Sequence, residues 1–168
     1  FRRCSSDLGE EIMRRKDREI TDPAKIRAII SACSCCRLGF ADGESVYIVP
    51  LSFGYCEDGE KRTFYFHSAG EGRKIELISK NPCAGFELDT NYKLNESTKA
   101  CGYSARFQSV VGSGNVSFVE DTNEKRKALL AIMYQNTGKE EWEFSEEMFD
   151  AVCTFKLEVS EMSCKEHS

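Results

Sequence analysis

The chain has 168 residues, of which 40% are hydrophobic and 30% charged, so its length suits one domain with a real core. Its 23 basic and 28 acidic residues give a formal net charge of −5, so it lacks the cation surplus of non-specific nucleic-acid binders. No apolar run approaches the length of a membrane span and no signal-peptide pattern opens the sequence, which predicts a cytoplasmic protein without a membrane partner.

Turn and cap signals divide the chain into short elements. Residues 1–12 are polar and aperiodic, so we expect a flexible leader followed by a single domain over residues 13–168. Asp22-Pro23 predicts a helix start, because Asp caps a first turn and Pro suits the first helical position. The expected elements are, in chain order, a helix to about Cys35, strands at 36–41, 45–55 and 63–68, a helix at 73–79, a strand at 83–90, a loop at 92–102, strands at 103–114 and 115–119, helices from Asp121 to about Gln135 and from Ser145, and a strand at 152–159.

The connections predict antiparallel pairing. Asp42-Gly43 and Asp58-Gly59 are hairpin turn signals, and most strands are linked by segments of hairpin length. Pro50 cannot donate to a ladder, so the 45–55 run must bend, bulge or face an edge there. No long β–α–β series is present, which argues against a Rossmann sheet. We therefore expect a mainly β fold with peripheral helices, of the α+β class.

Nine cysteines are spread irregularly along the chain. An odd count at such spacing is a poor disulfide framework, and only Cys33, Cys35 and Cys36 cluster. His67 and His167 are too far away in sequence to complete a usual zinc pattern. We expect free thiols that act as small core hydrophobes, with no essential disulfide and no metal; a cysteine-ligated metal protein is the alternative.

The stretch from Ser68 to Lys74 is the best candidate for an anion site. Its glycines permit close approach of a ligand to the backbone, and the N–H groups of the helix that follows attract phosphate. Ser68 adds a hydroxyl, and Arg73 and Lys74 add charge. A plain turn with a solvated Arg-Lys pair is the alternative.

Two further features are less specific. The kinked segment from Val49 to Tyr55 leaves backbone N–H and C=O groups without ladder partners, which is the alternation a flavin pyrimidine edge needs. An ordinary bulged edge strand would look the same. His67, flanked by aromatic residues on a strand, is by itself most simply a hydrogen-bonded structural residue.

In order and spacing, three motifs resemble the pyridoxamine-5′-phosphate-oxidase-like flavin proteins, and within them the nitroimidazole-resistance branch. The motifs are Arg14–Glu19 (RRKDRE), Pro50–Tyr55 (PLSFGY) and Tyr65–Ala69 (YFHSA), and the resemblance covers about Met13 to Val159. Members of this family are FMN-binding split β-barrels that form homodimers with two flavin sites at the interface. The resemblance implies the same antiparallel split barrel, cofactor and dimer for this chain.

The resemblance also implies roles for individual residues. The strand bordering the isoalloxazine ring carries Val49, Pro50, Leu51, Ser52 and Phe53. The strand end beside the ribityl chain carries His67, Ser68 and Ala69, and the phosphate turn carries Gly72, Arg73 and Lys74. Ser109 and Val110 are expected near the cofactor, and Trp142 near the flavin pocket of the partner subunit.

The resulting functional expectation is an FMN-dependent oxidoreductase that reduces a small acceptor such as a nitroaromatic. The cofactor supplies the redox chemistry and the protein orients it, with His67 as the candidate catalytic proton donor. Two alternatives stay open: a pyridoxamine- or pyridoxine-phosphate oxidase, which needs a second phosphate site, and a flavin-binding protein without specific turnover. The physiological acceptor and the electron donor are not predicted.

Overall fold

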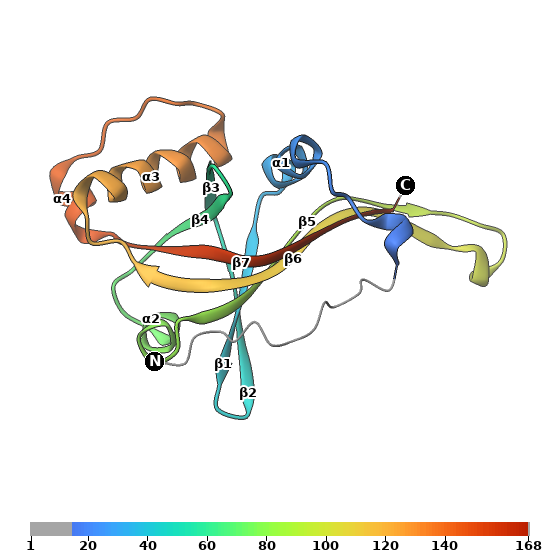
Figure 1. Ribbon diagram of the computed structural model, residues 1–168, viewed down its shortest axis with the longest axis horizontal. Helices are drawn as coiled ribbons and strands as arrows, with labels where there is room; N and C mark the ends of the chain where they lie inside the picture. Colours follow the sequence, from blue (N-terminus) through green and yellow to red (C-terminus); the bar gives the residue numbers. More distant parts are fainter. Residues whose placement is uncertain (1–14, 168) are drawn as a thin grey trace.

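A computed structural model describes residues 15–167, which form one seven-stranded antiparallel sheet with helices packed on it (Figure 1). The strands are β1 (Cys36–Asp42), β2 (Ser45–Leu51), β3 (Phe53–Asp58), β4 (Lys61–Ser68), β5 (Cys83–Asn95), β6 (Ser104–Phe118) and β7 (Cys153–His167). The helices are α1 (Pro23–Ala32), α2 (Arg73–Lys80), α3 (Thr122–Thr137) and α4 (Glu146–Ala151), with 3-10 turns η1 (Lys16–Arg18) and η2 (Ala100–Gly102). The order across the sheet is β2-β1-β5-β6-β7-β4-β3. The predicted leader, residues 1–12, lies outside the described residues.

The predicted cap signals are confirmed at both longer helices. The Asp22 carboxylate accepts hydrogen bonds from the backbone N–H groups of Ala24 and Lys25, at 3.2 and 3.3 Å. The Asp121 carboxylate accepts one from the N–H of Glu124 at 2.8 Å. These bonds satisfy backbone N–H groups in the first turn that otherwise have no partner in the helix, so each helix begins directly after its Asp.

The chain crosses from one edge of the sheet to the other at Ser52. Of the outcomes expected at Pro50, the edge position is confirmed: Pro50 stays in β2, paired with Arg37, on an edge strand where a missing N–H is tolerated. The 45–55 run, expected as one strand, is divided at Ser52, after which β3 forms the opposite edge. β2 ends at Leu51 on one edge of the sheet, and β3 begins at Phe53 on the other edge. Because only Ser52 separates them, the sheet must curve until its two edges approach each other, which gives a split barrel that does not close.

Three strands differ in extent from those predicted. The loop expected at 92–102 is wrong over its first part, because β5 runs to Asn95 past an irregularity between Thr90 and Lys93. The two strands expected at 103–119 are one, β6, with a register shift at Ser113/Gly114. β7 continues to His167, far beyond the predicted end at Val159, and pairs with β6 throughout. Ladder bonds to neighbouring strands extend these strands where local residue preference indicates a loop.

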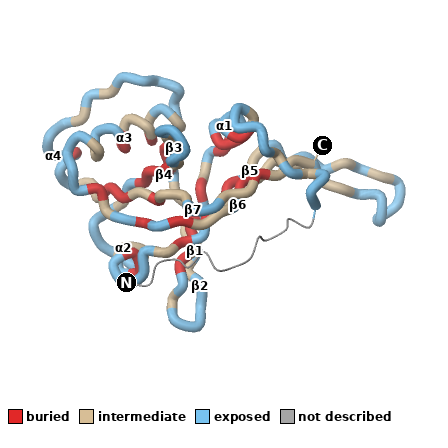
Figure 2. Tube along the Cα trace, in the orientation of Figure 1, coloured by how far each residue is buried: buried red, intermediate tan, exposed pale blue. Residues whose placement is uncertain are grey.

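Two clusters of buried side chains form the core, and Figure 2 shows the buried segments running along the middle of the sheet. The larger cluster lies between the sheet and helices α1 and α2, and its phenylalanines exposed by 1% or less are Phe40, Phe53, Phe64, Phe66 and Phe155. The smaller cluster lies under α3 and α4 and contains Tyr65, Leu129, Ile132 and Phe149. Side chains of β4 belong to both clusters, with Phe64 and Phe66 in the larger and Tyr65 in the smaller.

The cysteines are mostly free, as expected, with one exception. Seven described cysteines are free thiols, and burial raises the pKa of Cys33 to about 12 and of Cys164 to about 11. Cys83 is disulfide-bonded, so the expectation of nine free thiols is wrong at that position. Within residues 15–167, no helix combines the length and apolar character that crossing a membrane requires.

Candidate functional site

A shallow pocket lies where β4 ends, and three of the predicted site residues line it. Its volume is about 450 Å³, and its walls are His67, Ser68 and Ala69 from the end of β4 and Met148, Ala151 and Val152 at and after α4. His67 and Ala69 are exposed and Ser68 is half-buried. The pocket therefore joins a polar strand end to an apolar wall.

The helix that follows this strand end starts without a side-chain cap. Gly72 is the N-cap of α2 at φ 110°, a conformation that favours glycine, and it offers only its backbone. Its carbonyl accepts from the N–H groups of Ile75 and Glu76, at 3.0 and 3.2 Å. The N–H groups at the beginning of α2 thus remain available to an anion, and the helix dipole favours a negative charge there.

The two cations beside Gly72 differ in their surroundings. The Arg73 guanidinium donates from Nε to Asp42 Oδ2 at 2.9 Å, also binds Asp42 Oδ1, and donates from NH1 to Glu76 Oε2 at 3.0 Å. These carboxylates raise the pKa of Arg73. Lys74 is half-buried and forms no ion pair within residues 15–167. Of the two predicted phosphate cations, Lys74 is therefore the one available to a ligand.

The segment from Val49 to Phe53 reaches the same region through the strand crossing. Val49 and Leu51 pack partly buried against the larger core cluster, while Pro50 and Ser52 are exposed. Phe53 is fully buried and pairs with Phe66, the residue before His67. The exposed backbone at Ser52 consequently lies close to the end of β4, whereas the Phe53 side chain belongs to the core.

The remaining predicted residues do not line this pocket. Ser109 is half-buried in β6, paired with Asp89 and Lys165, and Val110 is fully buried in the core. Trp142 is half-buried after α3, where its Nε1 donates to the Lys139 carbonyl at 3.3 Å. Within one subunit these three residues lie apart from His67 and Lys74.

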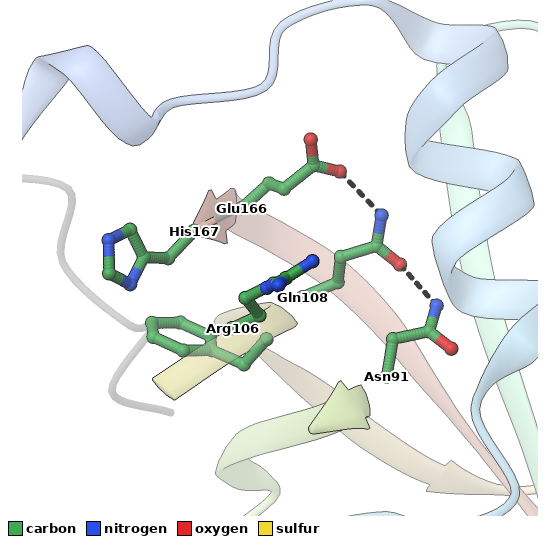
Figure 3. A pocket seen from close by; sticks show the side chains of 6 residues that line it. Asn91, Arg106, Gln108, Glu166 and His167 are labelled. Carbon is green, nitrogen blue, oxygen red and sulfur yellow. Dashed lines mark hydrogen bonds between the residues drawn. The ribbon is translucent and has the colours of Figure 1, made fainter. Parts of the chain in front are cut away.

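A second, polar pocket of about 170 Å³ was not anticipated (Figure 3). It is lined by Asn91, Arg106, Phe107, Gln108, Glu166 and His167. Asn91 Nδ2 donates to Gln108 Oε1 at 2.7 Å and Gln108 Nε2 donates to Glu166 Oε2 at 2.5 Å, as Figure 3 shows. Hydrogen bonds from Lys25 and Gln108 lower the pKa of Glu166. The pocket depends on the extended ends of β5 and β7, so the sequence offered no signal for it beyond a run of polar residues.

Comparisons with known proteins agree with this architecture. The family model described as pyridoxamine 5′-phosphate oxidase matches residues 22–166. The chain belongs to this family. Among solved structures, a candidate 5-nitroimidazole antibiotic resistance protein from Bacteroides thetaiotaomicron is 35% identical, with a TM-score of 0.75 over 88% of this chain and 86% of that one. The resemblance predicted from the three motifs is thereby confirmed, as is the antiparallel split-barrel fold.

Less similar solved structures share the fold. The flavocytochrome Anf3 from Azotobacter vinelandii is 18% identical at a TM-score of 0.74, over 94% of this chain and 72% of that one. A FAD-binding protein from Mesorhizobium loti is 21% identical at a TM-score of 0.62, over 90% and 98%. A search of curated proteins finds no match. Within residues 15–167, no group of three or more His, Cys, Asp or Glu side chains is arranged to hold a metal ion.

Proposed function

We propose that this pyridoxamine 5′-phosphate oxidase family member binds FMN at the end of β4 and is a flavin-dependent oxidoreductase that reduces a small acceptor such as a nitroaromatic. The observation that carries the proposal is the pocket at the end of β4, where an apolar wall faces the strand end that leads, within four residues of Ser68, to the uncapped start of α2 at Gly72. The likeness to the candidate nitroimidazole resistance protein supports the acceptor class.

The donor set fits a phosphate-bearing flavin. Backbone N–H groups after Gly72, the Ser68 hydroxyl and the Lys74 ammonium are the donors that a phosphate dianion accepts from. Ser68 Oγ now donates to the Ala69 carbonyl at 2.7 Å, and a hydroxyl rotates readily to serve a ligand instead. The exposed backbone around Ser52 supplies the alternating donor and acceptor for a ring edge.

The chemistry divides between cofactor and protein. Bound FMN would supply the transfer of reducing equivalents to the acceptor. His67 lines the pocket and is exposed, so its imidazole can hold and deliver a proton to the acceptor. Met148 and Val152 form an apolar wall that favours a flat, weakly polar acceptor over a charged one.

We also propose that two subunits associate through the outer face of the sheet, which would place the flavin sites at the dimer interface. On β2, Val46 and Ile48 are 68% and 63% exposed, and on the same face of β6 Val111 is 48% exposed. Gly39 pairs with both Ile48 and Gly85, so this part of the face carries no bulky side chains, and beside it Arg37 and Glu87 form an ion pair at 2.9 Å on the same face. Exposed aliphatic side chains next to an ion pair whose charges neutralise each other can pack against a second copy of the same face about a two-fold axis, which favours a second copy of this chain as the occupant.

The phosphate role predicts a ligand-specific loss for Lys74→Ala. One charge-assisted hydrogen bond to phosphate corresponds to about a tenfold to hundredfold change in the dissociation constant. We expect this loss for FMN in a fluorescence titration and less than about twofold for riboflavin, which has no phosphate. Lys80→Ala, at the other end of α2 and exposed, is the matched control and should change the dissociation constant of neither FMN nor riboflavin. Equal losses for both ligands would mean that Lys74 acts on the fold.

The interface predicts that Ile48→Asp separates the subunits. A dimer of standard size buries about 1,600 Å² in total, and a carboxylate at its centre must be desolvated without a partner. We expect sedimentation velocity to show a dimer for the unaltered protein and a monomer with much weaker flavin binding for Ile48→Asp. Tyr134→Asp, equally exposed but on α3, should remain dimeric. A monomeric parent protein that binds FMN tightly would rule out the shared site.

A substrate panel separates the candidate reactions. With the flavin-loaded protein reduced under anaerobic conditions, we expect a nitroimidazole to reoxidise it faster than buffer does. In the converse direction, pyridoxamine 5′-phosphate should leave the oxidised flavin unchanged. Reduction of the flavin by pyridoxamine 5′-phosphate would instead favour the phosphate-oxidase activity named in the family model.

A further inference from the structure

Lys125, a residue of α3 to which sequence reasoning gives no role, lies over an aromatic ring of α4, the helix whose end lines the proposed ligand pocket. Its ammonium lies 5.0 Å from the centroid of the Phe149 ring, and its side chain is half-buried. Phe149 belongs to α4, and its neighbours Met148 and Ala151 line the pocket together with Ser68. The contact with Phe149 therefore holds the Lys125 ammonium against α4, the helix whose end lines the pocket.

Lys74 approaches the same place from α2. Figure 1 shows that α3 begins, α4 ends and the chain leaves β4 for α2 at the same end of the sheet. Ser68, the last residue of β4, pairs with Cys153, the first of β7. Burial raises the pKa of the Cys153 thiol, and the charges of Lys125 and Lys74 both oppose that rise. Both ammonium groups therefore interact electrostatically with the same thiol, which follows the pocket residue Val152.

Burial and charge pairing together distinguish these lysines from the neighbouring cations. Arg73 binds Asp42, and Lys156 binds Glu124 at 2.7 Å, whereas Arg126, whose guanidinium lies 5.2 Å from the same Phe149 ring, is exposed to solvent. Lys74 and Lys125 form no ion pair within the part of the chain that the structure describes. In a chain of net charge −5, two half-buried ammonium groups without acidic partners beside one pocket indicate an anionic ligand.

We propose that Lys125 is the second cation of the phosphate site, binding the same phosphate group as Lys74 from the opposite wall, while Arg73 stays engaged by Asp42. This inference rests on the proposed function, since the site is the proposed flavin-phosphate pocket. It names a binding residue on α3, an element 51 positions beyond Lys74 in the sequence (125 against 74). Arg73 is then a residue that orients the start of α2 and makes no direct phosphate contact.

The test replaces Lys125 with Met, which keeps an unbranched side chain over Phe149 and removes the charge. We expect the dissociation constant for FMN to rise by about tenfold to a hundredfold and that for riboflavin to change by less than about twofold. Lys125→Arg should restore FMN binding to near the parent value. Lys127→Met, exposed on the same helix, is the matched control and should change neither constant.

The outcomes separate the two proposals. FMN binding unchanged in Lys125→Met, or FMN and riboflavin weakened equally, would overturn the role of Lys125 and leave the flavin proposal standing. If the parent protein binds neither flavin, the proposed function fails, and inorganic phosphate becomes the probe. Binding of phosphate, measured by phosphorus NMR line broadening and lost in Lys125→Met, would still support the two-lysine site. No phosphate binding by the parent protein would end both proposals.

Discussion

Replacing Phe64 with Ala should lower the free energy of unfolding by about 3–5 kcal/mol, the range measured for truncating a fully buried aromatic side chain. Phe64 is 0% exposed and lies at the centre of the aromatic cluster of the larger core. Its ring centroid is 5.7 Å from that of Phe53, 4.9 Å from Tyr55 and 5.0 Å from Phe86. Truncation removes these contacts together and leaves a cavity between β3, β4 and β5.

Denaturant unfolding at equilibrium measures this loss, with the slope compared between variants to confirm that only stability has changed. Tyr134→Ala is the matched control, because that ring is 53% exposed on α3. Surface truncations of this kind change stability by about 0.5 kcal/mol or less. A loss below about 1 kcal/mol for Phe64→Ala would mean that the cluster repacks without a cavity.

Gly54→Ala should be the second most damaging of these changes, at about 2–3 kcal/mol, because it forces an atom into occupied space. Gly54 lies on β3 where α3 crosses it. A Cβ atom there would stand 2.5 Å from both the backbone carbon of Ala131 and the backbone nitrogen of Ile132. Backbone atoms within a helix cannot move aside individually, so the whole helix must shift away from the sheet.

A shift of α3 would carry Lys125 with it, so Gly54→Ala should also weaken FMN binding, and the loss should exceed that for riboflavin. Tyr134→Ala provides the comparison, since that ring is exposed on the same helix and makes no contact with β3 that the substitution would remove. We expect that control to unfold within about 0.5 kcal/mol of the parent protein. Unchanged stability in Gly54→Ala would mean that α3 does not pack on β3 as described.

The predictable part of the fold is the part that local chemistry decides. The Asp caps before α1 and α3 satisfy helix donors within three residues, and the Gly43 and Gly59 turns need only their own positive φ angles of 63° and 60°. The same turn signals, together with residues that favour strands, located β1 and β4. These features depend on neighbours in the sequence, which is why they could be predicted without the sheet.

The candidate site divides in the same way. His67, Ser68, Gly72 and Lys74 are contiguous along a strand–turn–helix segment, so their common location followed from the chain itself. The sequence could not show that Arg73 is held by Asp42, which is 31 positions away. It also could not show that Phe53 and Val110 point into the core, because one residue of register decides which face a side chain occupies.

Contacts between residues far apart in the sequence decided the lengths of the strands, the crossing at Ser52 and the position of Lys125. β5 and β7 extend past their predicted ends, and β6 continues across the predicted break at residue 114, because each adds ladder hydrogen bonds to a neighbour. The crossing at Ser52 exists because its two flanking strands bond to opposite edges of the sheet. The contact between Lys125 and Phe149 depends on the packing of α4 against α3. Composition, caps and turns determine which segments form elements, whereas the partners of those elements, and hence the site, are determined by contacts between residues far apart in the sequence.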